Sequence, residues 1–426
     1  MDNGKADAST VPAPLQGVTV IELSHLIAGP YSPQLLASEG ALVIKVERPG
    51  GELSRHREPM RHGNGGSVSA HYASYNQGKQ SIVLDLKNDE GLSTLHGLIA
   101  SANVFVTNFR HAALKRLGLD PKTLLERYPA LVIACVSGYG FERSGEYADR
   151  AGLAMVAEAT SGVTALTRDH AGNPVWCGYP LGDVLAGMTA HSAILLALRN
   201  QDRFGVGRII DLGLVDCALP LAAIALARIQ LADEELSAFA AANDYHGVPY
   251  GVYPASDGFV NIGVNSDVFW RRLCAAMERT DLGTDPRYAT YIERAKRQSE
   301  VNAITSAFSS SLTRAELTAK LTEVDVPAAS VLTTHEVLNN EYVKQRGLLH
   351  QVDDGIGGTL TLPVNPAYPD PTYMPRIPRL DQHRSEVLAS RLGLTAADIE
   401  RLERAGAFGP LVDVGSGANT SNTAPT

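Results

Sequence analysis

Asp183 has the setting that most favours chemistry. It follows a Gly-Tyr-Pro-Leu-Gly turn in VWCGYPLGDVLAGM (175–188) and precedes apolar and small residues that predict a helix from Val184. In the simpler interpretation its carboxylate is the N-cap of this helix and accepts backbone N–H bonds from the first turn. The same place suits a nucleophile, because the helix dipole keeps the carboxylate anionic and the glycines let a substrate approach.

Basic residues in three loops form a second group. They occur in ERPGGELSR (47–55), NQGKQSIVLDLK (76–87) and NFRHAALKRLG (108–118), as Arg48, Arg55, Lys79, Lys87, Arg110, Lys115 and Arg116. Each one alone is interpreted as a surface charge, but loops after neighbouring parallel strands converge, so together they indicate a site for a ligand that bears phosphates. GxxxxGK[ST] and GxGxxG motifs are absent from the sequence, which disfavours an ATPase or a dinucleotide-dependent dehydrogenase.

Other classes of site find less support. His191 lies on an apolar helical face and is interpreted as a core residue, and without a GxSxG elbow a Ser-His-Asp hydrolase is disfavoured. The four cysteines are far apart, with no CxxC and no histidine at ligand spacing, so we expect neither disulfides nor a metal site.

Composition and net charge limit the classes of partner that we expect. The 426 residues carry a net charge of −9, which argues against nucleic acid as a partner. We found no run approaching the roughly 18 apolar residues of a membrane helix and no signal peptide, so we expect no membrane segment and a cytoplasmic location.

The positions of these residues follow from an alternation of short apolar strands and amphipathic helices. Strands are predicted at 17–23, 42–48, 81–86, 104–109, 131–140 and 207–214, with helices between them and two long helices from Val184 and at about 215–230. This alternation predicts an α/β fold with a doubly wound parallel sheet, whose ligands bind at the carboxyl ends of the strands. A hairpin at 250–264 and Arg/Glu/Ser-rich helices after it indicate a smaller α+β domain.

Five blocks, in this order, resemble the class III CoA-transferases (the CaiB/BaiF family, with formyl-CoA and carnitine CoA-transferases). They are GVTVIELSHLIAGPYSPQLLASEGALVIKVERPGGE, YNQGKQSIVLDLKNDEG, VFVTNFRHAALKRLGLD, ALVIACVSGYG and GDVLAGMTAHSAILLAL with GVGRIIDLGLVDCAL. The resemblance is dense over residues 15–265 and thin beyond them. It implies a Rossmann-like large domain built from both termini, with an N-terminal part at 1–225 and a return linker and C-terminal part at 331–426, around a small domain at 226–330, and two chains interlocked as a homodimer.

The resemblance also implies a mechanism. The nucleophilic aspartate of the family falls on Asp183, which would form an acyl anhydride with a donor acyl-CoA and then an aspartyl-CoA thioester that an acceptor acid resolves. Coenzyme A would be a substrate, and no tightly bound cofactor is expected. We expect succinyl-CoA as the donor and a dicarboxylate as the acceptor.

The site residues that the resemblance implies form two sets. Those for coenzyme A are Leu26, Ile27 and Ala28 at the thiol end, Arg48 at the phosphates, Leu84 and Lys87 at the adenine, and Asn108, Phe109 and Arg116 along the groove. Candidates to line the acyl pocket are Tyr139, Tyr179, Tyr245 and His246.

Three positions depart from relatives. Ala154 replaces an acidic residue, so an auxiliary carboxylate is expected to be missing; Ile27 replaces a glutamine; and NDYHGVPYGVYP (243–254) stands where formyl-CoA transferase has a glycine-rich loop. Formyl-CoA and oxalate are therefore poor guesses. An acyl-CoA racemase is one alternative, but its His-Asp pair falls on Leu153 and Ala154, which cannot transfer protons. A non-catalytic CoA-binding subunit of a hetero-oligomeric transferase is the other alternative.

Overall fold

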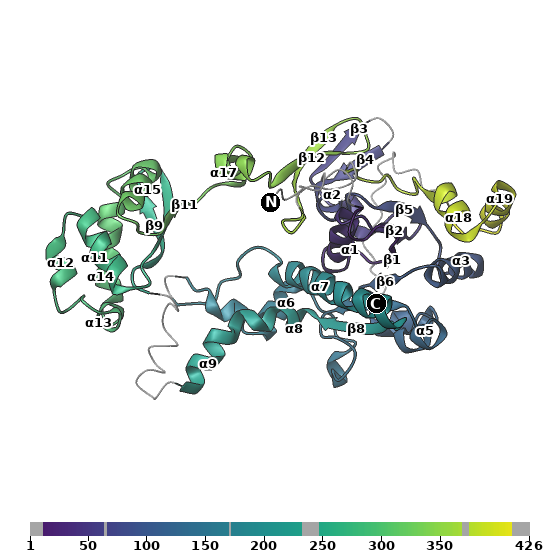
Figure 1. Cartoon of the computed structure of the whole chain (residues 1–426), viewed down its shortest axis with the longest axis horizontal. Helices are drawn as coiled ribbons and strands as arrows, with labels where there is room; N and C mark the ends of the chain where they lie inside the picture. The colour runs from purple at the N-terminus through teal and green to yellow at the C-terminus, as the bar shows by residue number, and fades with distance from the viewer. Residues whose placement is uncertain (1–11, 64–65, 170–171, 232–246, 369–374, 411–426) are drawn as a thin grey trace, which may run out of the picture. The chain divides into compact units, whose positions relative to one another are not determined.

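The computed structural model describes residues 12–63, 66–169, 172–231, 247–368 and 375–410. The chain divides into two compact units (Figure 1). The first unit comprises Met1–Ala222 and Lys344–Thr426, and the second comprises Ala223–Val343. The first unit is thus built from both ends of the chain. The sequence analysis predicted domain boundaries at 225/226 and 330/331, and in the structure the two units divide at 222/223 and 343/344.

A six-stranded parallel sheet is the centre of the first unit. Its strands are β1 (Thr19–Leu23), β2 (Leu42–Glu47), β5 (Gln80–Val83), β6 (Val104–Thr107), β7 (Val132–Ser137) and β8 (Arg208–Gly213). They lie in the order β5-β2-β1-β6-β7-β8, and every neighbouring pair is parallel. This is the doubly wound order in which the chain reverses direction between the first and fourth strands, here β1 and β6. The predicted parallel α/β fold is confirmed, and the switch point lies at the ends of β1 and β6.

Helices cover both faces of this sheet. One face packs against α3 (Asp89–Ala100), α4 (His111–Arg116), α5 (Pro121–Arg127), α18 (Arg384–Leu392) and α19 (Ala396–Arg404). The other packs against α1 (Ala28–Ser38) and α7 (Leu181–Phe204). Along β1, Ile21 and Leu23 belong to the first core and Val20 to the second, as expected for a strand buried on both faces.

Smaller elements complete the first unit. Two antiparallel pairs, β3 (Met60–Gly63) with β4 (Gly66–Ser69) and β12 (Leu349–Asp353) with β13 (Thr359–Pro363), pack with α2 (Ala70–Asn76) around Tyr72 and Val352. Short helices α6 (Ala154–Thr160) and α8 (Leu214–Ala218) lie against α7. Helix α19 begins at the predicted N-cap, Thr395, which forms a capping box with Asp398.

The second unit is a small α+β domain. The predicted hairpin is β9 (Tyr250–Ala255) with β10 (Gly258–Gly263), and β11 (Ala328–Ser330) adds a third antiparallel strand. The helices are α9 (Ala223–Leu231), α11 (Asp267–Ala276), α12 (Thr280–Thr284), α13 (Tyr291–Ala295), α14 (Gln298–Ser309), α15 (Arg314–Glu323), α16 (Thr334–Val337) and, across the boundary, α17 (Glu341–Gln345). Its core surrounds the fully buried Trp270.

Two sequence predictions about apolar helices were wrong. The helix expected at 215–230 is interrupted by a 3₁₀ turn at Leu219–Ala222, where Pro220 removes a backbone donor. Two stretches, Leu181–Phe204 and Leu214–Leu231, are in fact long and apolar enough to cross a membrane, judged by length and composition alone. The apolar character of α7 comes from its buried face, since Ala186, Ala190 and Ile194 are buried in the cores of the first unit.

Candidate active site

Asp183 belongs to the first turn of α7 and does not cap it. The helix begins at Leu181, its N-cap position is Pro180, and that residue makes no side-chain capping bond. The N-cap interpretation was therefore wrong by one turn, because the turn before Asp183 already has helical backbone bonds such as Val184 N–H to the Pro180 carbonyl. Among the described residues, no donor forms a hydrogen bond with the Asp183 carboxylate. Its oxygens are left free to react.

Glu158 takes over the capping role. This side chain of α6 is 1% exposed, and its Oε1 accepts the Gly182 backbone N–H at 3.0 Å while its Oε2 accepts the indole N–H of Trp176 at 2.7 Å. Glu158 thus satisfies one of the N-terminal amides that α7 cannot pair internally. It also ties the turn before the helix to α6, so the residue next to Asp183 is fixed from outside the helix.

The electrostatic consequence falls on Asp183. Burial, together with the negative charge of Glu158, raises the pKa of Asp183 to about 6. A carboxylate with this pKa is still mostly ionised at pH 7, and it is more basic than an ordinary aspartate, which makes it a better nucleophile. The arrangement therefore prepares Asp183 to attack an electrophilic carbon.

An auxiliary carboxylate is consequently present in this part of the site. Position 154 carries no carboxylate, as the sequence indicated, but Glu158 lies one helical turn further along α6 and faces the same way. Ala154 itself is 4% exposed and packs beside Gly182. The spacing of four residues in LAMVAEATSG was the signal that could have identified Glu158 from sequence.

The loop after β1 holds an unusual backbone conformation. Leu26 has φ of 66°, in the left-handed region where a leucine costs roughly 1–2 kcal/mol. Asn108 clamps the preceding residue, since its Oδ1 accepts the His25 N–H at 3.0 Å and its Nδ2 donates to the His25 carbonyl at 2.7 Å. A side chain at Gly29 would meet the Ser24 Cβ at 2.5 Å, so only glycine fits there. The ends of β1 and β6 are thus locked together at the switch point.

A buried ion cluster lies beneath this loop. Glu22 of β1 contacts the ammonium groups of Lys45 and Lys79, each at 2.7 Å, and all three side chains are fully buried. Lys45 also donates to the Ser24 carbonyl at 3.0 Å and Lys79 to the Pro30 carbonyl at 2.7 Å. Burial, only partly offset by Glu22, lowers the pKa of Lys79 to about 7. The cluster fixes the backbone that enters α1.

Two of the basic residues are therefore structural. Lys79 was interpreted as a surface charge, and the structure places it in the buried cluster. Arg55 was interpreted in the same way, but its guanidinium forms a bidentate pair with Glu47 at 2.7 Å and lies over the Tyr72 ring. Charge and loop position alone did not reveal that both are paired inside the fold.

Other predicted CoA-site residues lie at the carboxyl edge of the sheet. Lys87 follows β5, Arg48 follows β2, Leu26–Ala28 follow β1, and Arg116 belongs to the helix after β6. Arg48, Lys87 and Arg116 are exposed, and none forms an ion pair with a described residue. The three free cations thus follow strands of one sheet edge, which suits phosphates.

Three of the predicted CoA contacts are buried side chains. Leu84 is 1% exposed within the sheet core, so only its backbone can face a ligand there. Ile27 and Ala28 are 6% and 7% exposed at the start of α1. Phe109 is half-buried against the same core, with its ring 5.6 Å from that of His25. These residues can therefore contact a ligand through their backbone more than through their side chains.

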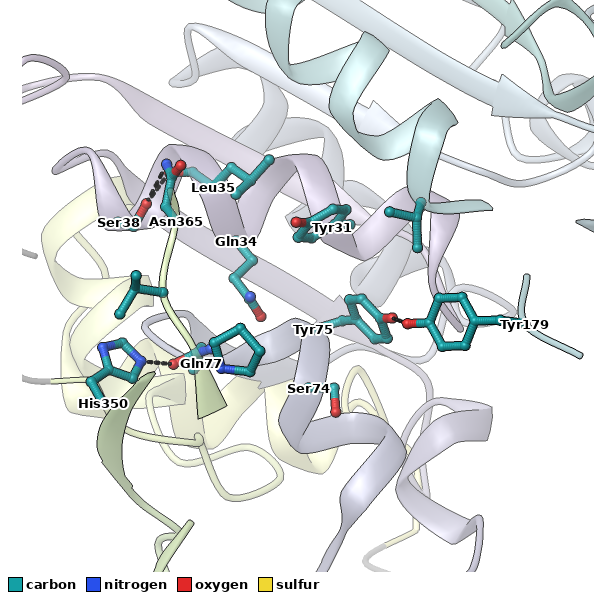
Figure 2. A pocket seen from close by; sticks show the side chains of 13 residues that line it. Tyr31, Gln34, Leu35, Ser38, Ser74, Tyr75, Gln77, Tyr179, His350 and Asn365 are labelled. Atoms are coloured by element: carbon teal, nitrogen blue, oxygen red, sulfur yellow. Dashed lines mark hydrogen bonds between the residues drawn. The ribbon is translucent and has the colours of Figure 1, made fainter. Parts of the chain in front are cut away.

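A cavity of about 200 Å³ opens beside Asp183 in the first unit (Figure 2). Tyr179 and Val184, on either side of Asp183 in sequence, line it, and the Tyr179 hydroxyl bonds to that of Tyr75 at 2.7 Å. Burial and the hydrogen bond with Tyr179 raise the pKa of Tyr75, and the negative charge of Asp183 adds to this increase. Of the predicted acyl-pocket residues, Tyr179 lines this cavity.

Tyr139 is a second predicted acyl-pocket residue, and it does not line this cavity. Tyr139 follows β7 and its ring lies against Tyr147, away from the cavity lining. Tyr245 and His246 lie outside the described residues. Tyr75 and Gln34, which the sequence analysis did not select, do line the cavity. The described part of the chain contains no group of three or more histidine, cysteine or acidic side chains placed to hold a metal ion.

The sequence and structure comparisons agree with one another. The model of CoA-transferase family III matches residues 15–384. The succinyl-CoA–D-citramalate CoA-transferase of Chloroflexus aurantiacus is 33% identical, with 92% of this chain and 97% of the relative covered. The alpha and beta subunits of the succinyl-CoA–L-malate CoA-transferase from the same organism are each 31% identical, covering 91% and 93% of this chain and 91% and 98% of the relatives.

A solved structure shares the fold as well. A CAIB/BAIF family protein from Brucella suis superimposes with a TM-score of 0.77 at 28% identity, and the match covers 89% of this chain and 99% of that one.

Proposed function

The chain belongs to CoA-transferase family III, and from that premise we propose that it transfers CoA from succinyl-CoA to a dicarboxylic acid through Asp183. The observation that carries the proposal is the half-buried Asp183 carboxylate in the first turn of α7, which accepts no hydrogen bond from a described residue and has its pKa raised to about 6. Relatives named as succinyl-CoA-dependent transferases of citramalate and malate support the choice of donor and the class of acceptor.

The proposed reaction is a sequence of acyl transfers. A carboxylate oxygen of Asp183 attacks the thioester carbon, the C–S bond breaks, and CoA thiolate leaves an acyl anhydride on the enzyme. The thiolate then attacks the Asp183 carbonyl carbon, which releases the donor acid and forms an aspartyl-CoA thioester. The acceptor carboxylate repeats these two steps in reverse order, which returns Asp183 as a carboxylate. No net proton is taken up or released.

Each step needs stabilisation of an oxyanion and a place for coenzyme A. The N-terminus of α1, whose N-cap position Ile27 makes no side-chain cap bond, offers free amides at the switch point. Arg48, Lys87 and Arg116 are the cations that we assign to the nucleotide phosphates, since they are exposed and unpaired along one sheet edge. Leu26 and Asn108 fix the conformation of the loop between the amides of α1 and these cations.

Mass spectrometry tests the covalent step. Incubation with succinyl-CoA followed by hydroxylamine or borohydride is expected to give a hydroxamate or alcohol on the peptide that contains Asp183. The Asp183→Ala variant supplies the matched control and should carry no such mark. Unmodified wild-type protein, under conditions where CoA binding is measurable, would contradict a covalent aspartate mechanism.

A second candidate function also has an observation in its favour. Two relatives, each 31% identical to this chain, are named as alpha and beta subunits of one transferase. This chain would then be one subunit of a hetero-oligomer. Turnover of a CoA ester by the purified chain alone would decide for the self-sufficient enzyme.

Exposed apolar side chains support a homodimer, which we propose as the working assembly. In the first unit alone, large apolar side chains that are between 39% and 68% exposed include Leu153, Met155, Val156, Met188, Leu196, Phe204, Val206, Leu219 and Leu221. Large apolar side chains exposed in this number are expected where another chain covers the surface. Light scattering after size exclusion should give twice the 45.4 kDa chain mass without detergent. A monomer at micromolar concentration, or a protein that needs detergent, would contradict this assembly.

A further inference from the structure

The cavity at the start of α7 contains a buried amide oxygen that has no partner among the described residues. Gln34 of α1 is 8% exposed, and its Oε1 is buried without a hydrogen bond from any described residue. Figure 2 shows its amide directed into the space between Tyr31, Tyr75 and Gln77. A buried acceptor left unpaired costs about 1–3 kcal/mol, so a site that keeps one is prepared for a donor that arrives with a ligand.

Several of the surrounding polar groups are already paired. The hydroxyls of Tyr75 and Tyr179 bond to each other at 2.7 Å, and Gln77 Oε1 bonds to His350 Nε2 at 2.8 Å. Ser74 Oγ donates to the Ala70 carbonyl at 2.8 Å. Among the described lining residues, Gln34 Oε1 and His350 Nδ1 are the buried side-chain atoms that keep no partner, and of the two Gln34 belongs to the helix that packs against α7. The paired groups also fix the walls around it.

The charge of the lining limits the ligand. Its described side chains include no lysine or arginine, and burial lowers the pKa of His350, so that ring is neutral at pH 7. Asp183, an acidic residue, directly precedes the lining residue Val184. A second carboxylate is therefore poorly matched to this cavity, whereas a neutral hydroxyl can donate to Gln34 Oε1 without the cost of burying a charge.

We infer that this cavity receives a hydroxyl group on the acyl chain of the substrate, with Gln34 as the residue that recognises it. The inference rests on the proposed function, because Asp183 must hold the acyl group for its chain to reach the cavity. It adds a specificity that the reaction itself does not require: a hydroxy acid should be transferred better than the same acid without its hydroxyl. The cavity, at about 200 Å³, has room for such a side group.

Pairs of acceptors that differ by one hydroxyl test this inference. With butyryl-CoA as donor, kcat/KM is measured for malate against succinate, and with succinyl-CoA as donor it is measured for 3-hydroxybutyrate against butyrate. The wild-type enzyme is expected to favour a hydroxy acid by about tenfold or more, the effect of one buried hydrogen bond. In Gln34→Leu the ratio should fall to about one, mainly through loss of the hydroxy acid. Gln16→Leu, at an exposed glutamine, is the matched control.

The outcomes distinguish the role of Gln34 in substrate recognition from the covalent mechanism at Asp183. A preference that survives in Gln34→Leu, an equal loss for both members of a pair, or no preference in the wild type would overturn the role of Gln34. If Gln34→Leu does not fold, Gln34→Met supplies an adaptable side chain of similar length. The mark on the Asp183 peptide is measured in the same samples. Its presence with an unchanged ratio leaves the transferase mechanism intact, whereas its absence from the wild type removes the mechanism itself.

Discussion

Asp183→Asn is expected to lose CoA transfer by on the order of 10⁴-fold or more, since an amide cannot supply the attacking carboxylate. The loss should appear in kcat, because the substitution keeps the size of the side chain and leaves the free cations of the sheet edge in place. Single-turnover measurements with succinyl-CoA check it directly. A variant that retains a tenth of wild-type turnover would exclude Asp183 as the nucleophile.

The same substitution is expected to make the protein more stable at neutral pH. The folded-state pKa of Asp183 is raised from 3.8 to about 6, so the native state binds its proton more tightly than the unfolded chain does. The charged form therefore destabilises the fold above pH 6 by up to about 3 kcal/mol, and this cost disappears as pH falls from 6 to 3.8. Thermal unfolding should show a higher Tm for Asp183→Asn at pH 7.5, and the gain should shrink by pH 4.5. An equal gain at both pH values would contradict the origin in charge.

Glu158→Gln is expected to give the second largest effect. The wild-type kcat/KM should fall on the acid side of about pH 6, where Asp183 takes up its proton. Removing the negative charge of Glu158 lowers the pKa of Asp183, so this acid limb should move to lower pH in the variant. Activity at pH 7.5 should nevertheless fall by about tenfold, because Gln offers one acceptor oxygen where Glu158 uses two, for Gly182 and Trp176.

A pH profile of kcat/KM distinguishes this positioning role from a general loss of fold. Glu146→Gln changes an exposed glutamate that pairs with Arg150, and it should leave both the limb and the plateau unchanged. A Glu158→Gln profile that is lower at every pH but has the same acid limb would show that Glu158 does not influence the charge of Asp183. A limb that moves to higher pH would contradict the arrangement altogether.

The sequence by itself was sufficient for the sheet and for the proposal that Asp183 is the nucleophile. Apolar strands that alternate with amphipathic helices predicted the parallel fold, because a strand buried on both faces must be apolar along its length, as Ile21 and Val20 of β1 are. The family blocks and the Gly-Asp context identified Asp183. These signals are local, and each is written in consecutive residues of one segment.

Tertiary structure decided what each polar residue does. Lys79 and Arg55 look like Arg48 in sequence, yet the first two are paired in the interior with Glu22 and Glu47, whereas Arg48 is exposed and forms no ion pair with a described residue. Glu158 and Gln34 carry no motif, and their roles arise because α6 and α1 bring them to the start of α7. Burial and pairing depend on contacts between residues far apart in the chain, and those contacts determine which charges are neutralised, which pKa values shift and which acceptors stay open.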